Sequence, residues 1–418
     1  MKILYSCFIV LFVFLNKSTS ISNNSTLIDN DTFSYSREEV LPPLKSNSSW
    51  FHYKTFTVIS NVIEGIKPDY FNTLTLVLHM SNDRSFHGLH DRFINWRGPI
   101  SIGIYMVDNN LVISKETINT ICILKKYIKN RKNISVHLIF QKIIITDDDV
   151  NYLKNISLCY KKNDMKDNNF IGKNNNEIKK VSLYPINTIR NIARKLSKSK
   201  FLIVTDSDQM FSPGFEDKVL PVIKNEYAKN KKNVFVIRVF ETTSEKLING
   251  PKNKKQLLKL LKTHKAFVFH HSNIIYHGII KLKEWFKVKD NNESSVQIEI
   301  PYNNDAWEPK IIISKDAPYH DENFFYPYRD NTVLRWSLCV EEYKFLVLNN
   351  VFMYHLGIKS KKETDKMIKA RDIAKFRYNK ARDNFVKYYK SLNYTKIDSC
   401  LRKPNVVKIR KMLTDNIF

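Results

Sequence analysis

Two carboxylates stand one residue apart directly after a short apolar run in the middle of the chain. The run occupies residues 201–204, and Asp206 and Asp208 follow it. An unbroken apolar run of this length is typical of a strand covered on both faces, and ligands of open α/β sheets collect beyond the carboxyl ends of such strands. Two carboxylates at this spacing can hold one hard divalent cation, which can in turn bind a nucleotide diphosphate and stabilise it as a leaving group.

An Asp-x-Asp pattern is common, and the chain has a second one at residues 147–149, also after an apolar run. The alternative interpretation of either pattern is a solvated turn or a helix N-cap, where Asp is favoured. The pattern at 206–208 is distinguished by the segment before it, 184–196, which has helical spacing. One face of that helix is apolar, and a second face carries Asn187, Arg190, Asn191 and Arg194.

The elements that must position these residues follow from the spacing of the apolar side chains. Strands are predicted over 74–78, 100–107, 134–140, 201–204 and 233–240. Helices are predicted over 85–94, 115–129 and 184–196, and a further helix follows the turn at Pro213-Gly214 and ends at about residue 227. This alternation predicts an α/β fold with a doubly wound, mixed and mostly parallel central sheet. Towards the C-terminus we expect a helix over 251–262, short strands over 345–348 and 351–354, and a solvated pair of helices from 359 to 389.

Composition excludes several classes of function. The formal net charge is +27, which first suggests a polyanion partner, but the Lys residues are scattered and form no compact basic motif. We therefore expect no nucleic-acid partner. Gly is scarce, with 9 residues, and neither a P-loop nor a dinucleotide fingerprint is present.

The N-terminus predicts entry into the secretory pathway. Residues 1–20 contain an apolar stretch of h-region length, which fits a cleaved signal peptide or a short type II signal-anchor. Contact with a membrane is therefore expected only through this segment, if it stays uncleaved. Residues 21–68 are rich in Ser and Asn and predict a lumenal stem, and residues 403–418 are expected to form a C-terminal tail.

Cysteine usage agrees with an oxidising compartment. Outside the leader the chain has four cysteines, which suggests two disulfides with three possible connectivities. Their order favours Cys122–Cys159 and Cys339–Cys400. Asn-x-Ser/Thr sequons, among them Asn292 and Asn393, support lumenal exposure.

Further polar clusters lie in the second half of the chain. The paired His270 and His271 could suggest zinc, but His277 stands further on and no third ligand is found at a usual spacing, so a structural or acceptor-site role is favoured. Acidic residues stand beside aromatic ones at 304–309 and 319–324, a combination that suits a sugar site. The alternative is a surface loop with buried aromatic anchors.

Taken together and in order, these segments resemble glycosyltransferase family 49, which includes the C-terminal domain of the LARGE enzymes and a β-1,4-glucuronyltransferase. The resemblance covers residues 72–402. Its motifs are Ser81-x-Asp83-Arg84, Trp96-x-Gly98-Pro-Ile-Ser101, Tyr184-Pro-Ile-Asn187 with Arg190, Asn191 and Arg194, Asp206-Ser-Asp208, Val239-Phe-Glu241, Trp307-Glu-Pro309, Asp321-Glu322 and His355-Leu-Gly357-Ile-Lys359.

The resemblance implies a GT-A type, Rossmann-like nucleotide-sugar glycosyltransferase fold over residues 69–402. It implies Mn²⁺ as cofactor, bound by Asp206, Asp208 and His355, a ligand set that suits this ion. Lys359 would neutralise the β-phosphate as UDP leaves. The side that binds the uridine diphosphate would be lined by Arg84, Asn187, Arg190, Asn191 and Asp206.

The family is described as inverting, so the resemblance also implies a general base for the acceptor hydroxyl. Asp321 or Glu322 is expected in this role, with Asp305 and Glu308 as alternatives.

The expected function is transfer of a sugar from a UDP-sugar to a glycan or glycoprotein acceptor in the Golgi lumen. Glucuronate is the first donor expected and N-acetylglucosamine the second. The glycine after the Asp-Glu motif is replaced by residues 325–329, which leaves the donor open. The alternatives are an inactive carbohydrate-binding relative and a basic polyanion-binding protein.

Overall fold

The computed structural model describes residues 49–83, 86, 88–107, 111–129, 131–156, 159, 181, 183–358 and 361–414, all within one compact unit of the chain, 37–418. The leader, Arg84 and Lys359 lie outside the described residues, so the predictions made for them are not addressed by the structure. None of the described helices is long and apolar enough to cross a membrane.

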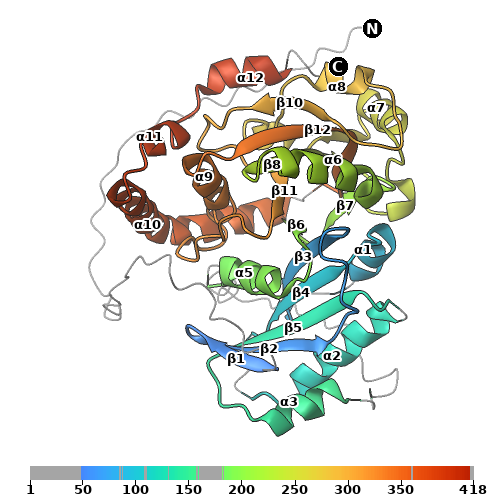
Figure 1. The fold of residues 1–418 in the computed structure, drawn as a ribbon, viewed down its shortest axis with the longest axis vertical. Helices are drawn as coiled ribbons and strands as arrows, with labels where there is room; N and C mark the ends of the chain where they lie inside the picture. Colours follow the sequence, from blue (N-terminus) through green and yellow to red (C-terminus); the bar gives the residue numbers. More distant parts are fainter. Residues whose placement is uncertain are drawn as a thin grey trace. The chain divides into compact units, whose positions relative to one another are not determined.

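Twelve strands of the described chain form one sheet in the order β1-β2-β5-β4-β3-β6-β11-β8-β12-β10, with β7 paired to β12 and β9 to β8 (Figure 1). Their bounds are β1 Trp50–Tyr53, β2 Phe56–Ile63, β3 Leu74–Ser81, β4 Ile100–Tyr105, β5 Ile134–Gln141, β6 Phe201–Thr205, β7 Gln209–Phe211, β8 Asn233–Thr242, β9 Ala266–Val268, β10 Val296–Ile300, β11 Lys310–Ser314 and β12 Lys344–Leu356. The four strands β5, β4, β3 and β6 are parallel, as are β8 and β12, and the other pairings are antiparallel. The predicted α/β class and mixed sheet are confirmed.

The helices connect these strands and cover the sheet. Their bounds are α1 Leu89–Asn95, α2 Lys115–Ile128, α3 Asp147–Lys154, α5 Ile186–Leu196, α6 Phe215–Lys229, α7 Lys254–Lys262, α8 Leu282–Lys287, α9 Thr332–Val340, α10 Lys361–Ser391, α11 Ile397–Cys400 and α12 Val406–Thr414, with 3₁₀ turns η1 Leu247–Asn249 and η2 His271–Asn273.

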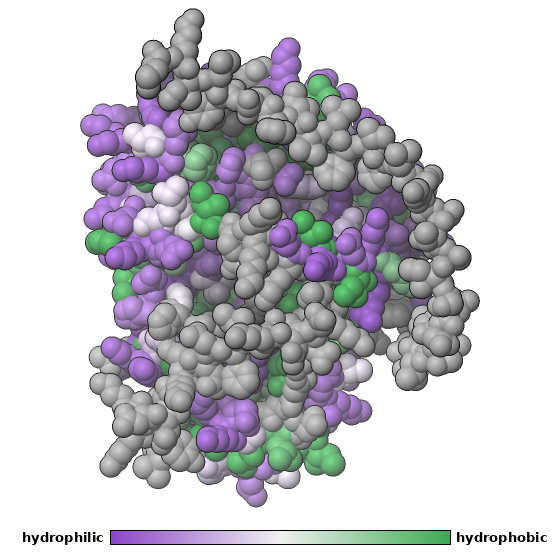
Figure 2. All heavy atoms as spheres, turned by 180° about the vertical axis from the view of Figure 1, so that it is seen from behind, coloured by the Kyte–Doolittle hydropathy of each residue, from purple (hydrophilic) through white to green (hydrophobic). Residues whose placement is uncertain are grey.

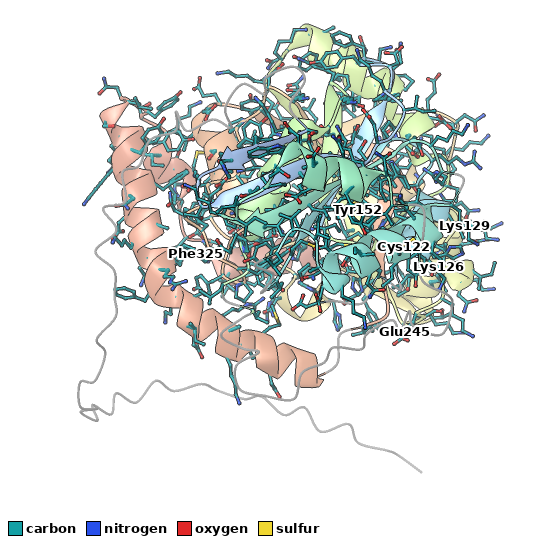
Figure 3. All side chains as sticks on the ribbon, turned by 90° about the horizontal axis from the view of Figure 1, so that it is seen from below. Cys122, Lys126, Lys129, Tyr152, Glu245 and Phe325 are labelled. Carbon is teal, nitrogen blue, oxygen red and sulfur yellow. A yellow bond between two sulfur atoms is a disulfide. The ribbon has the colours of Figure 1, made fainter. Side chains whose placement is uncertain are left out.

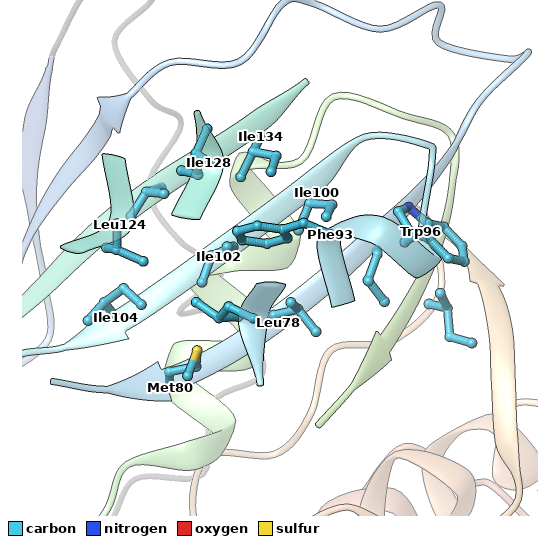
Figure 4. Close-up of a cluster of buried hydrophobic side chains, with 14 of the residues drawn as sticks. Leu78, Met80, Phe93, Trp96, Ile100, Ile102, Ile104, Leu124, Ile128 and Ile134 are labelled. Atoms are coloured by element: carbon cyan, nitrogen blue, oxygen red, sulfur yellow. The ribbon is translucent and has the colours of Figure 1, made fainter. Parts of the chain in front are cut away.

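The side-chain alternation of β4 shows why helices lie on both faces of the parallel part. Ile100, Ile102 and Ile104 point into the same apolar cluster as side chains of α1 and α2 (Figure 4). The residues between them are small, and α5 approaches there: Ser101 Oγ donates to the Ala193 carbonyl at 2.7 Å. A Cβ on Gly103 would meet Ile189 Cγ2 at 2.7 Å, so glycine allows the helix to pack this closely.

The strand order brings the two halves of the sheet together at the Asp-x-Asp segment. β6 belongs to the parallel part, but β7, only a few residues later, pairs with β12 beyond β11 and β8 (Figure 1). The chain between β6 and β7 therefore crosses from one half to the other. Asp206 and Asp208 occupy this crossing.

The N-terminal boundary of the folded part differs from the prediction. Residues 50–63, expected in the stem, form the hairpin β1–β2, and β2 pairs with β5 in the main sheet. Most of β2 is buried. The expectation was wrong here because the Ser- and Asn-rich composition ends near Ser49, whereas residues 56–63 are mainly apolar and β-branched and are buried on both faces.

The C-terminal part also differs from the prediction. The expected pair of helices is a single helix, α10, and the two short strands expected near 350 are one continuous strand, β12. The expected tail contains α12, whose Leu413 is buried against Gly278. β10 and β11 were not predicted, because each is only five residues long: β10 is mostly half-buried, and β11 has an apolar run of only three residues.

Two disulfides join Cys122 to Cys159 and Cys339 to Cys400, with Cα–Cα distances of 5.4 Å and 5.9 Å. These are the pairs that the order of the cysteines favoured, so the prediction is confirmed. The second disulfide ties α9 to α11.

The basic residues are spread over many elements. Helices α2, α7 and α10 each carry several Lys residues among other side chains. On the coloured part of the face in Figure 2, hydrophilic residues predominate and hydrophobic ones lie in small groups between them.

Candidate active site at the crossing between β6 and β7

Asp208 and His355 are brought together by the pairing of β7 with β12. His355 is the direct partner of Gln209 across these strands, and its Nε2 lies 3.0 Å from Asp208 Oδ2. The His355 side chain is 9% exposed and that of Asp208 is 48% exposed, so the pair is held by a buried imidazole and is accessible to solvent through the carboxylate. Two predicted metal ligands, 147 residues apart in sequence, are therefore neighbours.

The hydrogen bonds of His355 show which of its ring nitrogens could bind a cation. Nδ1 lies 2.8 Å from the carbonyl oxygen of Gly357, which can only accept, so Nδ1 carries the proton. In the neutral ring Nε2 is then an acceptor that faces a carboxylate, and two acceptors at 3.0 Å are complementary to a cation between them. Asp208 and His355 fit the predicted ion, although within the described residues no three His, Cys, Asp or Glu side chains converge as a complete metal site.

Asp206 has different neighbours from Asp208. Its Oδ1 lies 3.2 Å from His79 Nε2 and 3.7 Å from Arg190 Nη2, and its Oδ2 lies 3.4 Å from Lys310 Nζ. Burial works to raise the pKa of Asp206, but Lys310, His79 and Arg190 together hold it well below its usual range. Asp206 is therefore ionised at neutral pH, with the cationic groups of Lys310 and Arg190 beside its carboxylate.

His79 connects Asp206 to an aromatic group. Burial, and then the charge of Arg190, lower the pKa of His79, so the ring is neutral. Its Nε2–H donates to Asp206. The other ring nitrogen, Nδ1, lies 3.2 Å from the Tyr184 hydroxyl and accepts from it. The ring of Tyr326 lies 5.9 Å from that of Tyr184.

Tyr326 belongs to residues 325–329, the segment that departs from the family pattern. Its neighbour Phe325 lies beside α10 (Figure 3), with the guanidinium of Arg377 5.0 Å from its ring centroid. The departing segment therefore lies between α10 and the aromatic group that leads to Asp206.

Arg92 of α1 lies beneath the crossing and was not predicted from the sequence. Its side chain is fully buried, and its Nη2 donates to the carbonyl of Ser207 at 3.0 Å and to that of Asp206 at 3.5 Å. Burial lowers the pKa of Arg92 to about 10, so it remains charged at neutral pH. Arg92 thus shapes the main chain between the two carboxylates and adds positive charge below it.

The polar face of α5 points mainly towards residues 314–331. The Asn187 amide donates to the carbonyls of Asp321, Phe324 and Asp330, and the Asn191 amide donates to the carbonyl of His320. Arg190 donates to Asp330 at 2.7 Å and lies close to Asp206, so it is the member of this set that reaches the site. A role for Asn187 and Asn191 in binding the nucleotide stays a prediction.

The two residues expected as general base lie in this same segment. Glu322 accepts from four donors, with Tyr53 and Asn191 on Oε1 and Thr188 and Lys54 on Oε2, at 2.8–3.1 Å. Its side chain is 9% exposed. Oδ1 of Asp321 accepts from the backbone and side-chain amides of Asn323 at 2.9 Å and 3.0 Å. Glu322 therefore fastens the β1–β2 turn to α5, and the catalytic role of either residue stays a prediction.

The second Asp-x-Asp pattern lies in the first turn of α3. Thr146 accepts from the Asp149 backbone amide, and the Asp149 carboxylate accepts from the Thr146 backbone amide, which together form a capping box. The pattern therefore lies in the first turn of a helix whose N-cap is Thr146 rather than an aspartate, and not in the solvated turn that was expected.

His79, Lys310 and Arg92 are the site residues that sequence reasoning missed. His79 stands inside a strand, Lys310 begins a strand that was not predicted, and Arg92 is one of many basic residues in the chain. His79 was the easiest to find, because it lies in β3, the strand that leads to the Ser81-x-Asp83 motif.

Comparison with known proteins is informative at the level of sequence. A family model described as "Glycosyl-transferase for dystroglycan" matches residues 73–394. "Xylosyl- and glucuronyltransferase LARGE2s" of Danio rerio is 24% identical over 284 residues, which cover 68% of this chain and 31% of the relative. "Xylosyl- and glucuronyltransferase LARGE1" of Homo sapiens is 22% identical over 308 residues, which cover 73% and 33%. The chain thus spans about a third of the length of these curated relatives.

The similarity of this chain to solved structures is low, both in fold and in sequence identity. GalNAc-T7 with UDP, GalNAc and Mn²⁺ has a TM-score of 0.34 and 12% identity, covering 82% of this chain and 55% of that one. TarS of S. aureus in complex with UDP has a TM-score of 0.30 and 12% identity, covering 71% and 64%. The family match over most of the chain confirms the resemblance drawn from the motifs: the chain belongs to the family described as "Glycosyl-transferase for dystroglycan".

Proposed function

We propose that the chain is a Mn²⁺-dependent, inverting glycosyltransferase of GT-A type that moves a sugar from a UDP-sugar to a hydroxyl of a glycan or glycoprotein in the Golgi lumen. The observation that carries the proposal is the pair of Asp208 and His355, in which Nε2 faces a carboxylate while Nδ1 is fixed by the carbonyl of Gly357. Family membership supports the reaction class. The names of the relatives support glucuronate as the first donor to test.

Each residue of the site has a part in the proposed reaction. Asp206, Asp208 and His355 would hold Mn²⁺, which when bound supplies a Lewis acid for the diphosphate of the donor. Arg190 and Lys310 keep Asp206 ionised and contribute positive charge where UDP leaves. Arg92 holds the main chain of the crossing, so that the two carboxylates stay in place.

The test uses the full chain produced in a secretory host and measures two quantities. The first is UDP release from UDP-glucuronate and UDP-N-acetylglucosamine with Mn²⁺, and the second is the Kd of UDP with and without Mn²⁺. Asp208→Ala and His355→Ala each remove a ligand, so they should lower Mn²⁺-dependent UDP affinity by at least about tenfold. Asp148→Ala is the matched control, because it removes an exposed carboxylate from the middle of the other acidic cluster, residues 147–149, in the first turn of α3.

Wild-type affinity for UDP that does not depend on Mn²⁺, together with no UDP release from either donor, would contradict the proposal. The inactive carbohydrate-binding relative would then be the better interpretation. An equal loss in Asp148→Ala would show that the variants act through general destabilisation.

A further inference from the structure

Four side chains form a row across four strands on the face that carries His355. His355 of β12 is the direct partner of Gln209 of β7 and of Glu241 of β8, and Glu241 is the direct partner of Phe267 of β9. Residues paired directly across neighbouring strands point to the same face of the sheet. Glu241 therefore lies one strand spacing, about 4.8 Å between backbones, from the predicted metal ligand His355.

His271 completes this row beyond Glu241. Its ring is stacked on that of Phe267, with centroids 4.6 Å apart and planes 23° apart. Its Nδ1 lies 2.9 Å from Glu241 Oε1. Two contacts, one aromatic and one polar, thus fix both the position and the plane of the imidazole.

The exposure of the two partners differs sharply. The Glu241 side chain is 7% exposed, whereas that of His271 is 50% exposed. A carboxylate oxygen accepts, so the Nδ1–H of His271 donates to Glu241 Oε1. The ring nitrogen that can take up a further proton is then Nε2. A buried carboxylate that orients a half-exposed imidazole in this way is the arrangement by which enzymes prepare a general base.

Resting on the function proposed above, we propose that His271 is the general base that takes the proton of the acceptor hydroxyl, with Glu241 as its positioning residue. In this step the acceptor O–H bond breaks and its proton moves to His271 Nε2. The acceptor oxygen forms a bond to the anomeric carbon of the donor sugar, and the bond from that carbon to the β-phosphate oxygen breaks. The electron pair leaves with UDP, and the Glu241 carboxylate stabilises the imidazolium until its proton passes to solvent.

This assignment differs from the expectation that Asp321 or Glu322 is the base. Glu322 accepts from four donors and is 9% exposed, so a proton transferred to it would disrupt contacts that join three segments of the chain. In His271, by contrast, only Nδ1 is engaged by Glu241. The side chain is half exposed and lies next to the site.

The experiment measures UDP release with UDP-glucuronate and UDP-N-acetylglucosamine in Mn²⁺, with water standing in for the acceptor hydroxyl, and in parallel the Kd of UDP with Mn²⁺. His271→Ala should lower kcat by about 100-fold or more while the Kd is unchanged, because a general base contributes typically 10²–10⁴-fold. Added imidazole should restore part of the lost rate. Glu241→Gln should lower kcat without changing the Kd, because its amide can hold the ring in the wrong tautomer.

His264→Ala is the matched control. The ring of His264 also lies against Phe267, at 6.4 Å, but within the described residues it has no carboxylate partner like Glu241. It should leave both kcat and the Kd unchanged.

A wild-type kcat in His271→Ala, or a loss that imidazole does not restore, would overturn the assignment. So would Glu322→Gln abolishing kcat with unchanged Kd and stability, since the base would then lie in the 321–322 segment. Failure of the proposed function is a separate result, because it is observed in the wild-type chain as absence of both Mn²⁺-dependent UDP binding and UDP release.

Discussion

The two carboxylates of the Asp-x-Asp motif are one residue apart and have different environments. Asp206 is surrounded by Lys310, His79 and Arg190, whereas Asp208 faces His355. The reason is that β6 ends at Thr205 while β7 already pairs with β12, so the two side chains are directed to different halves of the sheet. The protein thereby keeps the Asp206 carboxylate ionised, whereas the Asp208 carboxylate lies against the imidazole of His355.

Buried histidines give the protein a dependence on pH that is separate from the site. His137 of β5 is fully buried; its Nδ1 accepts from the Asn61 backbone amide and its Nε2 lies 3.0 Å from Ser101 Oγ. Burial, and then the charge of Lys198, lower the pKa of His137 to about 3. The ring is therefore neutral in the folded chain at every pH at which the protein is expected to work.

We expect the free energy of unfolding to fall as the pH is lowered below about 6.5, where His137 of the unfolded chain takes up a proton that the folded chain excludes. At pH 5 this single group should cost about 2 kcal/mol relative to neutral pH. His137→Gln should show a shallower fall between pH 7 and pH 5 in denaturant titrations, and the exposed His90→Gln should not. Parallel slopes for the wild type and His137→Gln would rule out this origin.

At the scale of elements, hydrogen bonds from the side chains of α5 hold residues 314–331 in place. Its apolar side packs on β3 and β4, and its polar side binds the carbonyls of a segment with little regular structure. That segment has few backbone partners of its own, because β11 ends at Ser314 and α9 begins at Thr332. The side-chain amides and guanidinium groups of α5 therefore donate the hydrogen bonds that these carbonyls would accept from a neighbouring strand in a sheet.

Asn187→Ala should destabilise the protein by about 3 kcal/mol, because three buried carbonyls lose the donor that they share. The measurement is the free energy of unfolding by denaturant, with Asn151→Ala on the exposed side of α3 as the matched control. If Asn187→Ala keeps wild-type stability but weakens UDP binding, Asn187 contacts the nucleotide, as the resemblance implied.

At the scale of the whole molecule, the β1–β2 hairpin belongs to the catalytic domain. β2 covers the outer side of β5, and Tyr53 and Lys54 at the turn donate to Glu322. The hairpin thus joins the β5 edge of the parallel strands to residues 314–331, the segment held by α5. A catalytic fragment that begins at residue 69 lacks both of these contacts.

We expect a fragment of residues 37–418 to fold and a fragment of residues 69–418 to be strongly destabilised, because the second exposes the edge of β5 and leaves Glu322 without two donors. Thermal unfolding and Mn²⁺-dependent UDP binding of both fragments check this. Equal unfolding temperatures would mean that the hairpin is dispensable.

The sequence by itself determined the features that depend on local patterns and on motifs. The strands β3, β4, β5 and β6 and the helices α2 and α5 follow from periodicity, and the order of the motifs identified the family. These features are readable because each depends on residues close in sequence.

The tertiary structure alone decided which distant residues meet. The pairing of β7 with β12 sets Asp208 against His355, the packing of α1 places Arg92 beneath the crossing, and the row across β12, β8 and β9 brings His271 to Glu241. No local pattern encodes such contacts, because strand order and register are set by the burial of whole faces of the sheet.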